Sequence, residues 1–216
     1  MTTSSSNSRP GFIGRLRSRQ SGHPSGPLGR VVGRLMVKDT AATNDRALAK
    51  LDLTQSRTIL DVGFGQGRTA AVLVRAGHHV IGVDSSPTMV SQATARNRAA
   101  CREGRTNLKH SDGITIPFPD RSADAAITAH TIYFMPDPAA TIADIARVLR
   151  PGGTLAIACR TNDDETPAWL DPHVYRIRTA DEITAMLRAA GFDDIEHEQG
   201  DAATHFVHLF VARLAD

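Results

Sequence analysis

Residues 59–67 of this 216-residue chain read ILDVGFGQG, a short apolar run that leads directly into three glycines at alternate positions. The apolar run predicts a buried strand, and a helical pattern of apolar residues begins just after it, at about Thr69. Glycine lets the backbone turn sharply and approach a ligand closely, and the first turn of a helix offers N–H donors that have no partner within the helix. The stretch therefore predicts a strand, a ligand-binding turn and a helix, in that order.

The next strand-like run, VIGVD at residues 80–84, ends in Asp84, 17 residues after Gly67. A carboxylate at the tip of the second strand can accept hydrogen bonds from both hydroxyls of a ribose. Sites for dinucleotides use the pattern G-x-G-x-x-G/A, whose last small residue packs the helix against the strand. Here that position holds Arg68, so the pattern favours a different nucleoside ligand. A nicotinamide-dependent oxidoreductase is kept as an alternative.

Strand-like and helical segments alternate over the rest of the chain, which predicts an α/β fold with a parallel sheet covered by helices on both faces. The last two strand-like runs are joined by only Gly200–Ala203, so we expect an antiparallel hairpin there. The expected strands are Thr58–Val62, His79–Asp84, Asn107–His110, Ala123–Ala129, Gly153–Cys159, Asp194–Gln199 and Thr204–Ala212. The expected helices are Thr69–Ala76, Pro87–Arg102, Asp137–Leu149 and Ala180–Ala190, with two more between residues 28 and 51, the second at Ala42–Leu51.

Charge is unevenly distributed, although 25 Lys and Arg against 23 Asp and Glu leave a formal net charge of only +2. Residues 1–38 hold seven basic side chains and no acid, so the remainder carries a net charge of −5. Residues 1–26 are rich in Ser, Arg, Gly and Pro, and we expect a disordered basic arm there. Residues 27–216 are expected to form a single domain that begins with capping helices. The arm is interpreted as a solvated tail; contact with nucleic acid or an anionic membrane surface is the less favoured alternative.

Composition excludes several classes of protein. No apolar run approaches the roughly 18–20 residues of a membrane-spanning helix, and the charged first residues lack the apolar core of a secretory signal. Cys101 and Cys159 lie far apart without a metal-binding spacing, so neither a zinc site nor a disulfide framework is indicated. A cytoplasmic location is the simplest expectation.

The glycine-rich block resembles motif I of the class I S-adenosylmethionine (SAM)-dependent methyltransferases. Residues 110–120 (HSDGITIPFPD) are similar to the segment after that family's third strand, and residues 148–155 (VLRPGGTL) to its entry into strand five. Residues 178–192 resemble the helix before the family's terminal hairpin. Matching blocks cover about residues 57–212 in family order, and the methyltransferase type 11 group is the nearest resemblance. The resemblance implies a Rossmann-like, doubly wound sheet of seven strands in the order 3-2-1-4-5-7-6, with strand 7 antiparallel.

By position, the resemblance assigns cofactor contacts to the glycine-rich turn, the tip of the second strand and the loop after the third. The turn would hold the methionine part of SAM through main-chain atoms, with an acid that orients it. The second strand would bind the ribose and lie beside the adenine, and the loop would accept a hydrogen bond from the adenine amino group. These residues are Asp61, Gly63, Phe64, Gly65 and Gly67; Asp84, Ser85 and Met89; and Asp112 and Gly113. Lid contacts are expected from Asp39, Thr40 and Asn44.

Methyl transfer from a sulfonium is an in-line displacement that mainly requires alignment of nucleophile, methyl carbon and sulfur. A general base matters only where the acceptor must lose a proton. His130 stands at the end of the fourth strand, beside the expected sulfonium, and its ordinary pKa of about 6.5 suits a base. Tyr133 is a candidate for positioning the acceptor; lining the pocket and packing in the core are the alternative roles of these two residues. Further acceptor-side candidates are Arg160, Asn162, Trp169, His173 and Tyr175.

No metal is expected. Residues 163–165 (DDE) resemble carboxylates of magnesium-dependent methyltransferases of catechols, but Ala129-His130 stands where that arrangement needs an acid. The same position lacks the N-P-P-Y or D-P-P-Y turn of enzymes that methylate nucleic-acid bases. His205 and His208 are interpreted as structural. The prediction is a methyltransferase of a small-molecule acceptor that converts SAM to S-adenosylhomocysteine (SAH), as a monomer or homodimer. A non-catalytic SAM-binding protein is the other alternative.

Overall fold

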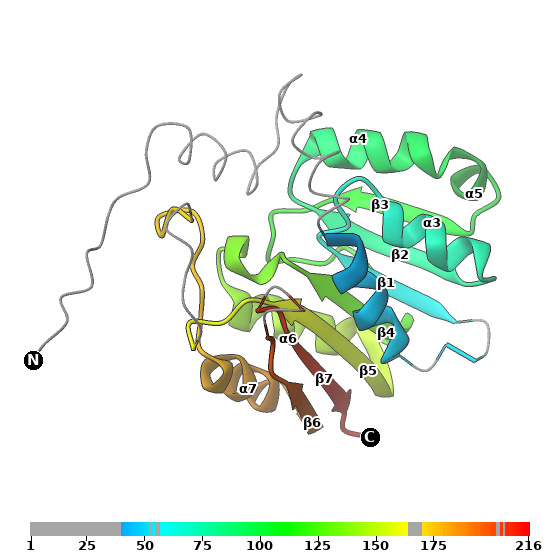
Figure 1. Cartoon of the computed structure of the whole chain (residues 1–216). Helices are drawn as coiled ribbons and strands as arrows, with labels where there is room; N and C mark the ends of the chain where they lie inside the picture. The colour runs from blue at the N-terminus through cyan, green and yellow to red at the C-terminus, as the bar shows by residue number, and fades with distance from the viewer. Residues whose placement is uncertain (1–39, 52, 55–56, 164–169, 202–203, 205) are drawn as a thin grey trace, which may run out of the picture.

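The computed structural model describes residues 40–51, 53–54, 57–163, 170–201, 204 and 206–216, and it shows a seven-stranded sheet between layers of helices (Figure 1). The strand order is β3-β2-β1-β4-β5-β7-β6. β7 is antiparallel to both of its neighbours, whereas the other ladders are parallel. The strands are β1 (Thr58–Val62), β2 (His79–Asp84), β3 (Thr106–His110), β4 (Ala123–Ala129), β5 (Leu149–Cys159), β6 (Phe192–Glu198) and β7 (His208–Leu214). The expected strand order and the antiparallel β7 are confirmed.

Helices cover both faces of the sheet. The helix at residues 40–49 and α3 pack on one face, and α6 and α7 pack on the other. Consecutive residues of β1 alternate between the two cores, since Ile59 belongs to the first and Leu60 to the second. A strand covered on both faces produces this alternation. The labelled helices are α3 (Arg68–Arg75), α4 (Pro87–Arg96), α5 (Arg98–Arg102), the 3-10 turn η1 (Ile132–Phe134), α6 (Pro138–Val148) and α7 (Ala180–Ala189).

Three elements differ most from the bounds expected from the sequence, and the other described elements differ by at most two residues at either end. The expected helix Pro87–Arg102 is divided at Asn97, whose side chain donates to the carbonyls of Gly67 at 3.0 Å and Ala93 at 2.9 Å. β5 begins at Leu149 because this residue already pairs with β4, ahead of a bulge. β7 begins at His208 rather than Thr204, because a turn closed by Asp201 precedes it.

Several expectations fall on residues outside the described part of the chain. These are the basic arm, the first capping helix, Asp39, Trp169 and His205. The second capping helix is present at residues 40–49.

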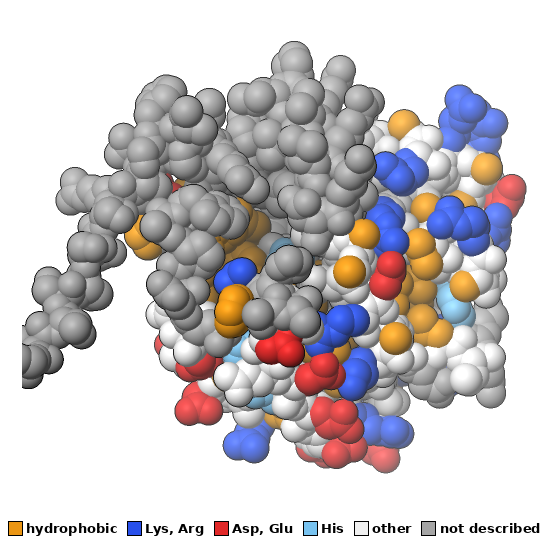
Figure 2. All heavy atoms as spheres, viewed as in Figure 1, with side chains coloured by type: hydrophobic (Ala, Val, Ile, Leu, Met, Phe, Trp, Pro, Cys, Tyr) orange, Lys and Arg blue, Asp and Glu red, His pale blue; other side chains and the backbone are white. Residues whose placement is uncertain are grey.

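Charged side chains are grouped on the face seen in Figure 2. Basic side chains gather over α3, α4 and α5, and acidic side chains gather over α7 and β6. None of the described helices is long and apolar enough to cross a membrane.

Candidate active site

The turn between β1 and α3 contains three glycines with left-handed backbone angles. Their φ values are +76° for Gly63, +53° for Gly65 and +70° for Gly67. A Cβ on Gly63 would lie 2.3 Å from Thr131 Oγ1, and a Cβ on Gly67 would lie 2.7 Å from Asn97 Nδ2. A Cβ on Gly65 would meet nothing within 4 Å. The surrounding chain therefore requires two of the glycines, whereas Gly65 borders open space.

Asp84, at the tip of β2, holds this turn in place. Its Oδ2 accepts a hydrogen bond from the Gly65 N–H at 2.9 Å, and its Oδ1 accepts one from the Ser86 N–H at 2.8 Å. The Gly63 N–H donates to the Val83 carbonyl at 2.8 Å, which ties the turn to β2 a second time. Asp84 thus holds the turn and also lines the cavity.

A cavity lies along the carboxyl ends of β1, β2 and β4, with an empty volume of about 1130 Å³ that includes its opening to solvent. Of the predicted cofactor residues, those that line it are Gly63, Phe64, Gly65, Asp84, Ser85, Met89, Gly113 and His130; the lid candidates Thr40 and Asn44 do so too. Asp61, Gly67, Asp112 and Tyr133 are outside its lining. Gln66, Thr69, Ser111, Thr131 and Phe134 line the cavity without having been predicted, and only their proximity to the motifs could have indicated them.

Asp112 is placed differently from what the resemblance implies. It is exposed, and its Oδ1 accepts hydrogen bonds from the N–H groups of Ile114 at 2.9 Å and Thr115 at 2.7 Å. These bonds hold the pKa of Asp112 below its ordinary value. The carboxylate closes the loop after β3 and is outside the cavity lining, and the implied adenine contact stays a prediction.

Asp61 is buried in β1 next to the turn. Burial, and then the negative charge of Asp84, raise the pKa of Asp61 from 3.8 to about 7. Asp61 Oδ2 has no hydrogen-bond partner among the described residues. A buried carboxylate is stable in its charged form only when a donor or positive charge accompanies it. A positive charge bound near this end of the site would therefore stabilise the charged form of Asp61.

His130 follows β4 in a left-handed conformation with φ +56°, and its N–H donates to the Ala158 carbonyl at 2.8 Å. It lines the cavity. Burial, and then the charge of Arg160, lower the pKa of His130 from 6.5 to about 4. The imidazole is thus neutral near pH 7, which is the form that can accept a proton.

Tyr133 lies behind His130. It is 3% exposed, its hydroxyl accepts from the Arg160 N–H at 2.5 Å, and the hydroxyl oxygen lies 3.5 Å from His130 Nδ1. Burial raises the pKa of Tyr133 well above its ordinary value, so the phenol stays neutral. Tyr133 is therefore placed to orient His130, whereas the sequence prediction has it positioning the acceptor.

Ion pairs hold the capping helix at residues 40–49 beside the cavity. Arg68 donates to both carboxylate oxygens of Asp45, at 2.8 and 2.9 Å. Lys50, just after the helix, pairs with Glu198 of β6 at 3.0 Å. Asn44 Nδ2 donates to Thr69 Oγ1 at 3.0 Å.

Two buried polar atoms of cavity-lining residues have no hydrogen-bond partner among the described residues. They are the acceptor Asn44 Oδ1 and the donor Gln66 Nε2. Leaving such atoms unpaired costs about 1–3 kcal/mol each. The amino acid end of SAM carries an ammonium and a carboxylate, which would supply a donor and an acceptor. These residues, together with the open space at Gly65, fit that group.

The remaining candidates have structural contacts. Asp163 Oδ2 accepts from the Ala180 N–H at 2.7 Å at the start of α7, and Asp171 accepts from the His173 N–H at 3.0 Å. His208 is buried and lies 2.8 Å from the ring of His197. The Tyr175 ring packs against Phe134, and the Asn162 N–H donates to the Arg178 carbonyl at 2.8 Å. Within the described residues, no group of three His, Cys, Asp or Glu side chains could hold a metal ion.

Comparisons with known proteins identify the family. Residues 60–157 match the model of a methyltransferase domain. The O-methyltransferase rstn1 of Aspergillus nomiae is 30% identical over 158 residues, which cover 68% of this chain and 69% of that protein. The arsenite methyltransferase of Halobacterium salinarum is 33% identical over 178 residues, 76% of this chain and 44% of that protein. A putative methyltransferase solved with the Haloferax volcanii activator Trm112 has a TM-score of 0.73 and 22% identity, with 97% and 100% coverage. The chain spans about three fifths of the length of several other curated relatives. It belongs to the class I SAM-dependent methyltransferases.

Proposed function

We propose that this protein transfers a methyl group from SAM to a small-molecule acceptor and releases SAH. The observation that carries the proposal is a single cavity bordered by the glycine turn, by Asp84 and by a neutral His130. The names of the two relatives described above, an O-methyltransferase and an arsenite methyltransferase, support acceptors of small size. The alternative of a nicotinamide-dependent oxidoreductase loses its basis with the family assignment.

The chain would hold SAM by its three parts. Asp84 would accept from the ribose hydroxyls, and Ser85 and Met89 would lie beside the adenine. Main-chain atoms of the turn at residues 63–65 would hold the methionine part, and Asn44 and Gln66 would pair with its charged ends. The proposed contacts use residues that line the cavity, and Asp61 would favour the positive charge of the cofactor from behind the turn.

Bound SAM supplies an electrophilic methyl group on a sulfonium. The contribution of the chain is alignment, which can lower a barrier by about 7–11 kcal/mol at its upper limit. Where the acceptor is a hydroxyl, neutral His130 can take the proton as the oxygen attacks the methyl carbon. Tyr133 would act through His130 as a positioning residue.

Calorimetry with the full chain separates the candidate cofactors. We expect SAH to bind, NAD not to bind, and Asp84→Ala to weaken SAH binding at least tenfold, because a charge-assisted partner of the ribose is lost. NAD binding without SAH binding would overturn the proposal.

Turnover is then measured as SAH formed from SAM with a panel of small acceptors. Turnover that depends on an added acceptor supports a methyltransferase. SAH binding with no turnover on any acceptor would favour a non-catalytic SAM-binding protein.

A further inference from the structure

Arg160 lies on the side of His130 that faces away from the glycine turn. It follows β5, which is the next strand beyond β4 in the sheet. Its N–H donates to the Tyr133 hydroxyl at 2.5 Å, so the start of this loop is fixed to the residue behind His130. Its positive charge is close enough to lower the pKa of His130. Arg160 therefore stands beyond His130 from the glycine turn, just outside the lining of the cavity.

The guanidinium of Arg160 has no counter-charge among the described residues. It is half-buried, and its side-chain contact there is with the ring of Phe206, whose centroid lies 5.8 Å from Arg160 Cζ. Arg147, in contrast, pairs with both Asp120 and Asp144 at 2.6 Å. A half-buried guanidinium without a partner remains available to pair with an anion.

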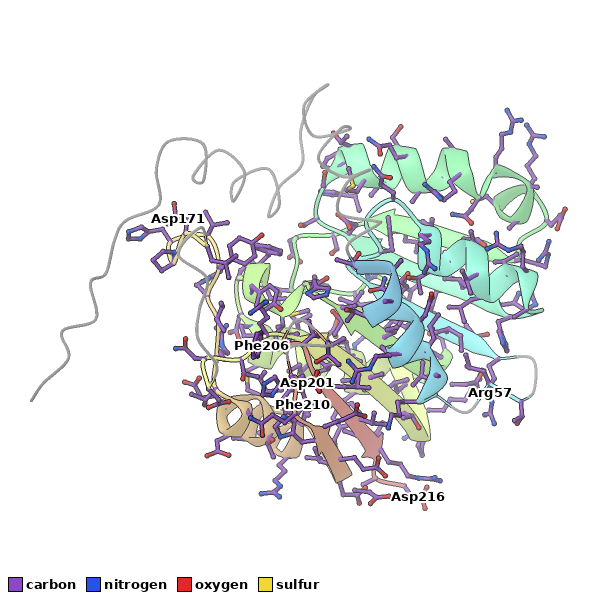
Figure 3. The ribbon with its side chains drawn as sticks, viewed as in Figure 1. Arg57, Asp171, Asp201, Phe206, Phe210 and Asp216 are labelled. Atoms are coloured by element: carbon purple, nitrogen blue, oxygen red, sulfur yellow. The ribbon has the colours of Figure 1, made fainter. Side chains whose placement is uncertain are left out.

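Phe206 is unusual in a second way. It is 40% exposed, the one large apolar side chain so exposed in the described part of the chain. Its backbone has a left-handed φ of +56°, held by a 2.7 Å hydrogen bond from its N–H to the Asp201 carbonyl. This conformation costs a residue with a Cβ about 1–2 kcal/mol. Figure 3 shows Phe206 close to Asp201, ahead of β7, while Phe210 lies within that strand and is fully buried.

We propose that Arg160 and Phe206 bind the methyl acceptor, and that the acceptor is a planar molecule with an anionic group, a carboxylate or a phosphate. This inference rests on the proposed function. A guanidinium matches the two oxygens of a carboxylate or phosphate, and an exposed aromatic ring stacks on a planar group. The acceptor would supply the counter-charge that Arg160 lacks among the described residues, and it would cover the exposed ring of Phe206.

The charge of the acceptor would also act on His130. An anion at Arg160 neutralises the charge that holds the pKa of His130 down, so the imidazole becomes a stronger base when the acceptor arrives. The same ion pair would then serve both recognition and proton removal.

The test uses calorimetry on the SAH-loaded full chain with matched probes: 4-hydroxybenzoate against 4-hydroxybenzamide, and phenyl phosphate against phenol. We expect each anion to bind at least tenfold more tightly than its neutral partner. Arg160→Gln should bring the two members of a pair within twofold of each other, and Arg160→Lys should retain part of the preference. Phe206→Ala should weaken both members. Arg188→Gln, an exposed arginine on α7, is the matched control and should keep the full preference.

The comparison of carboxylate with phosphate shows which anion the site prefers. The inference is overturned if no anionic probe is preferred by the wild type, or if the preference survives in Arg160→Gln. SAH binding is measured first in the same cell, so its loss would count against the proposed function, whereas intact SAH binding without anion preference counts against this inference alone. Thermal unfolding of each variant shows that it is folded.

Discussion

Gly65→Ala should separate the binding of SAM from the folding of the turn. The added Cβ would meet nothing within 4 Å, and it would stand in a residue that lines the cavity. The left-handed φ of +53° costs alanine about 1–2 kcal/mol, partly offset by about 0.4–1 kcal/mol because alanine restricts the unfolded chain. We expect a loss of stability of about 1 kcal/mol. A methyl group forced into a fitted site costs about 1–3 kcal/mol, so SAH should bind about 5- to 150-fold more weakly.

Gly104→Ala is the matched control. Gly104 also has a left-handed φ, +70°, and open space at its Cβ, but it lies between α5 and β3, outside the lining of the cavity. Urea unfolding should give both variants a similar loss of stability, and calorimetry with SAH should show weaker binding only for Gly65→Ala. Wild-type SAH affinity in Gly65→Ala would refute the placement of the cofactor at this turn.

Three further results are expected. Asn44→Ala and Gln66→Ala should each weaken SAH binding about tenfold. The affinity for 5′-methylthioadenosine, which lacks the amino acid end, should change by less than twofold. Gln92 also has a buried amide nitrogen without a hydrogen-bond partner among the described residues but lies outside the cavity lining, so Gln92→Ala should not change the affinity for either ligand. The raised pKa of Asp61 means that the folded state binds the extra proton, so its contribution to stability is lost as pH rises from about 4 to 7. Relative to the wild type, Asp61→Asn should gain stability in urea titrations as pH rises from about 4 to 7, and a difference that does not change with pH would contradict the burial argument. The lowered pKa of His130 has the opposite sign: the unfolded state takes up the proton, so stability is lost as pH falls from 6.5 to about 4. Because the Asp61 and His130 effects oppose each other in this range, His130→Gln is also compared with the wild type, and it should gain stability over the wild type as pH falls from 6.5 to about 4.

The sequence predicts best where one local rule decides the structure. β1, β2 and β4 have their expected bounds because each is an apolar run that ends at a turn signal or a polar residue. The break of the long helix at Asn97 could not be predicted in this way. Its cause is a hydrogen bond to the carbonyl of Gly67, 30 residues earlier in the chain, and helical periodicity contains no information about such a partner.

The same distinction applies to the site. Asp84 ends β2 and Asp112 follows β3, and both match the family by position. Asp84 accepts a hydrogen bond from the glycine turn and borders the cavity, whereas Asp112 accepts hydrogen bonds from the loop that follows it. In any loop, an Asp side chain can accept a hydrogen bond from the backbone N–H two residues later. Position in a motif therefore does not decide whether an Asp binds a ligand or its own loop.

The contacts of Tyr133 limit what His130 can do. The Tyr133 oxygen already accepts from the Arg160 N–H, and its single proton can be donated to His130 Nδ1, 3.5 Å away. Neutral imidazole carries one N–H, so this arrangement leaves the hydrogen on Nε2 and makes His130 a donor toward its other side. If Nδ1 instead donates to the Tyr133 oxygen, Nε2 is free of hydrogen and His130 is a base. The second arrangement is needed for proton removal from a hydroxyl, and the first suits an acceptor that is already ionised. The protonation state of the acceptor therefore decides which tautomer of His130 is needed. Tyr133 links that tautomer to Arg160, because its hydroxyl contacts both residues.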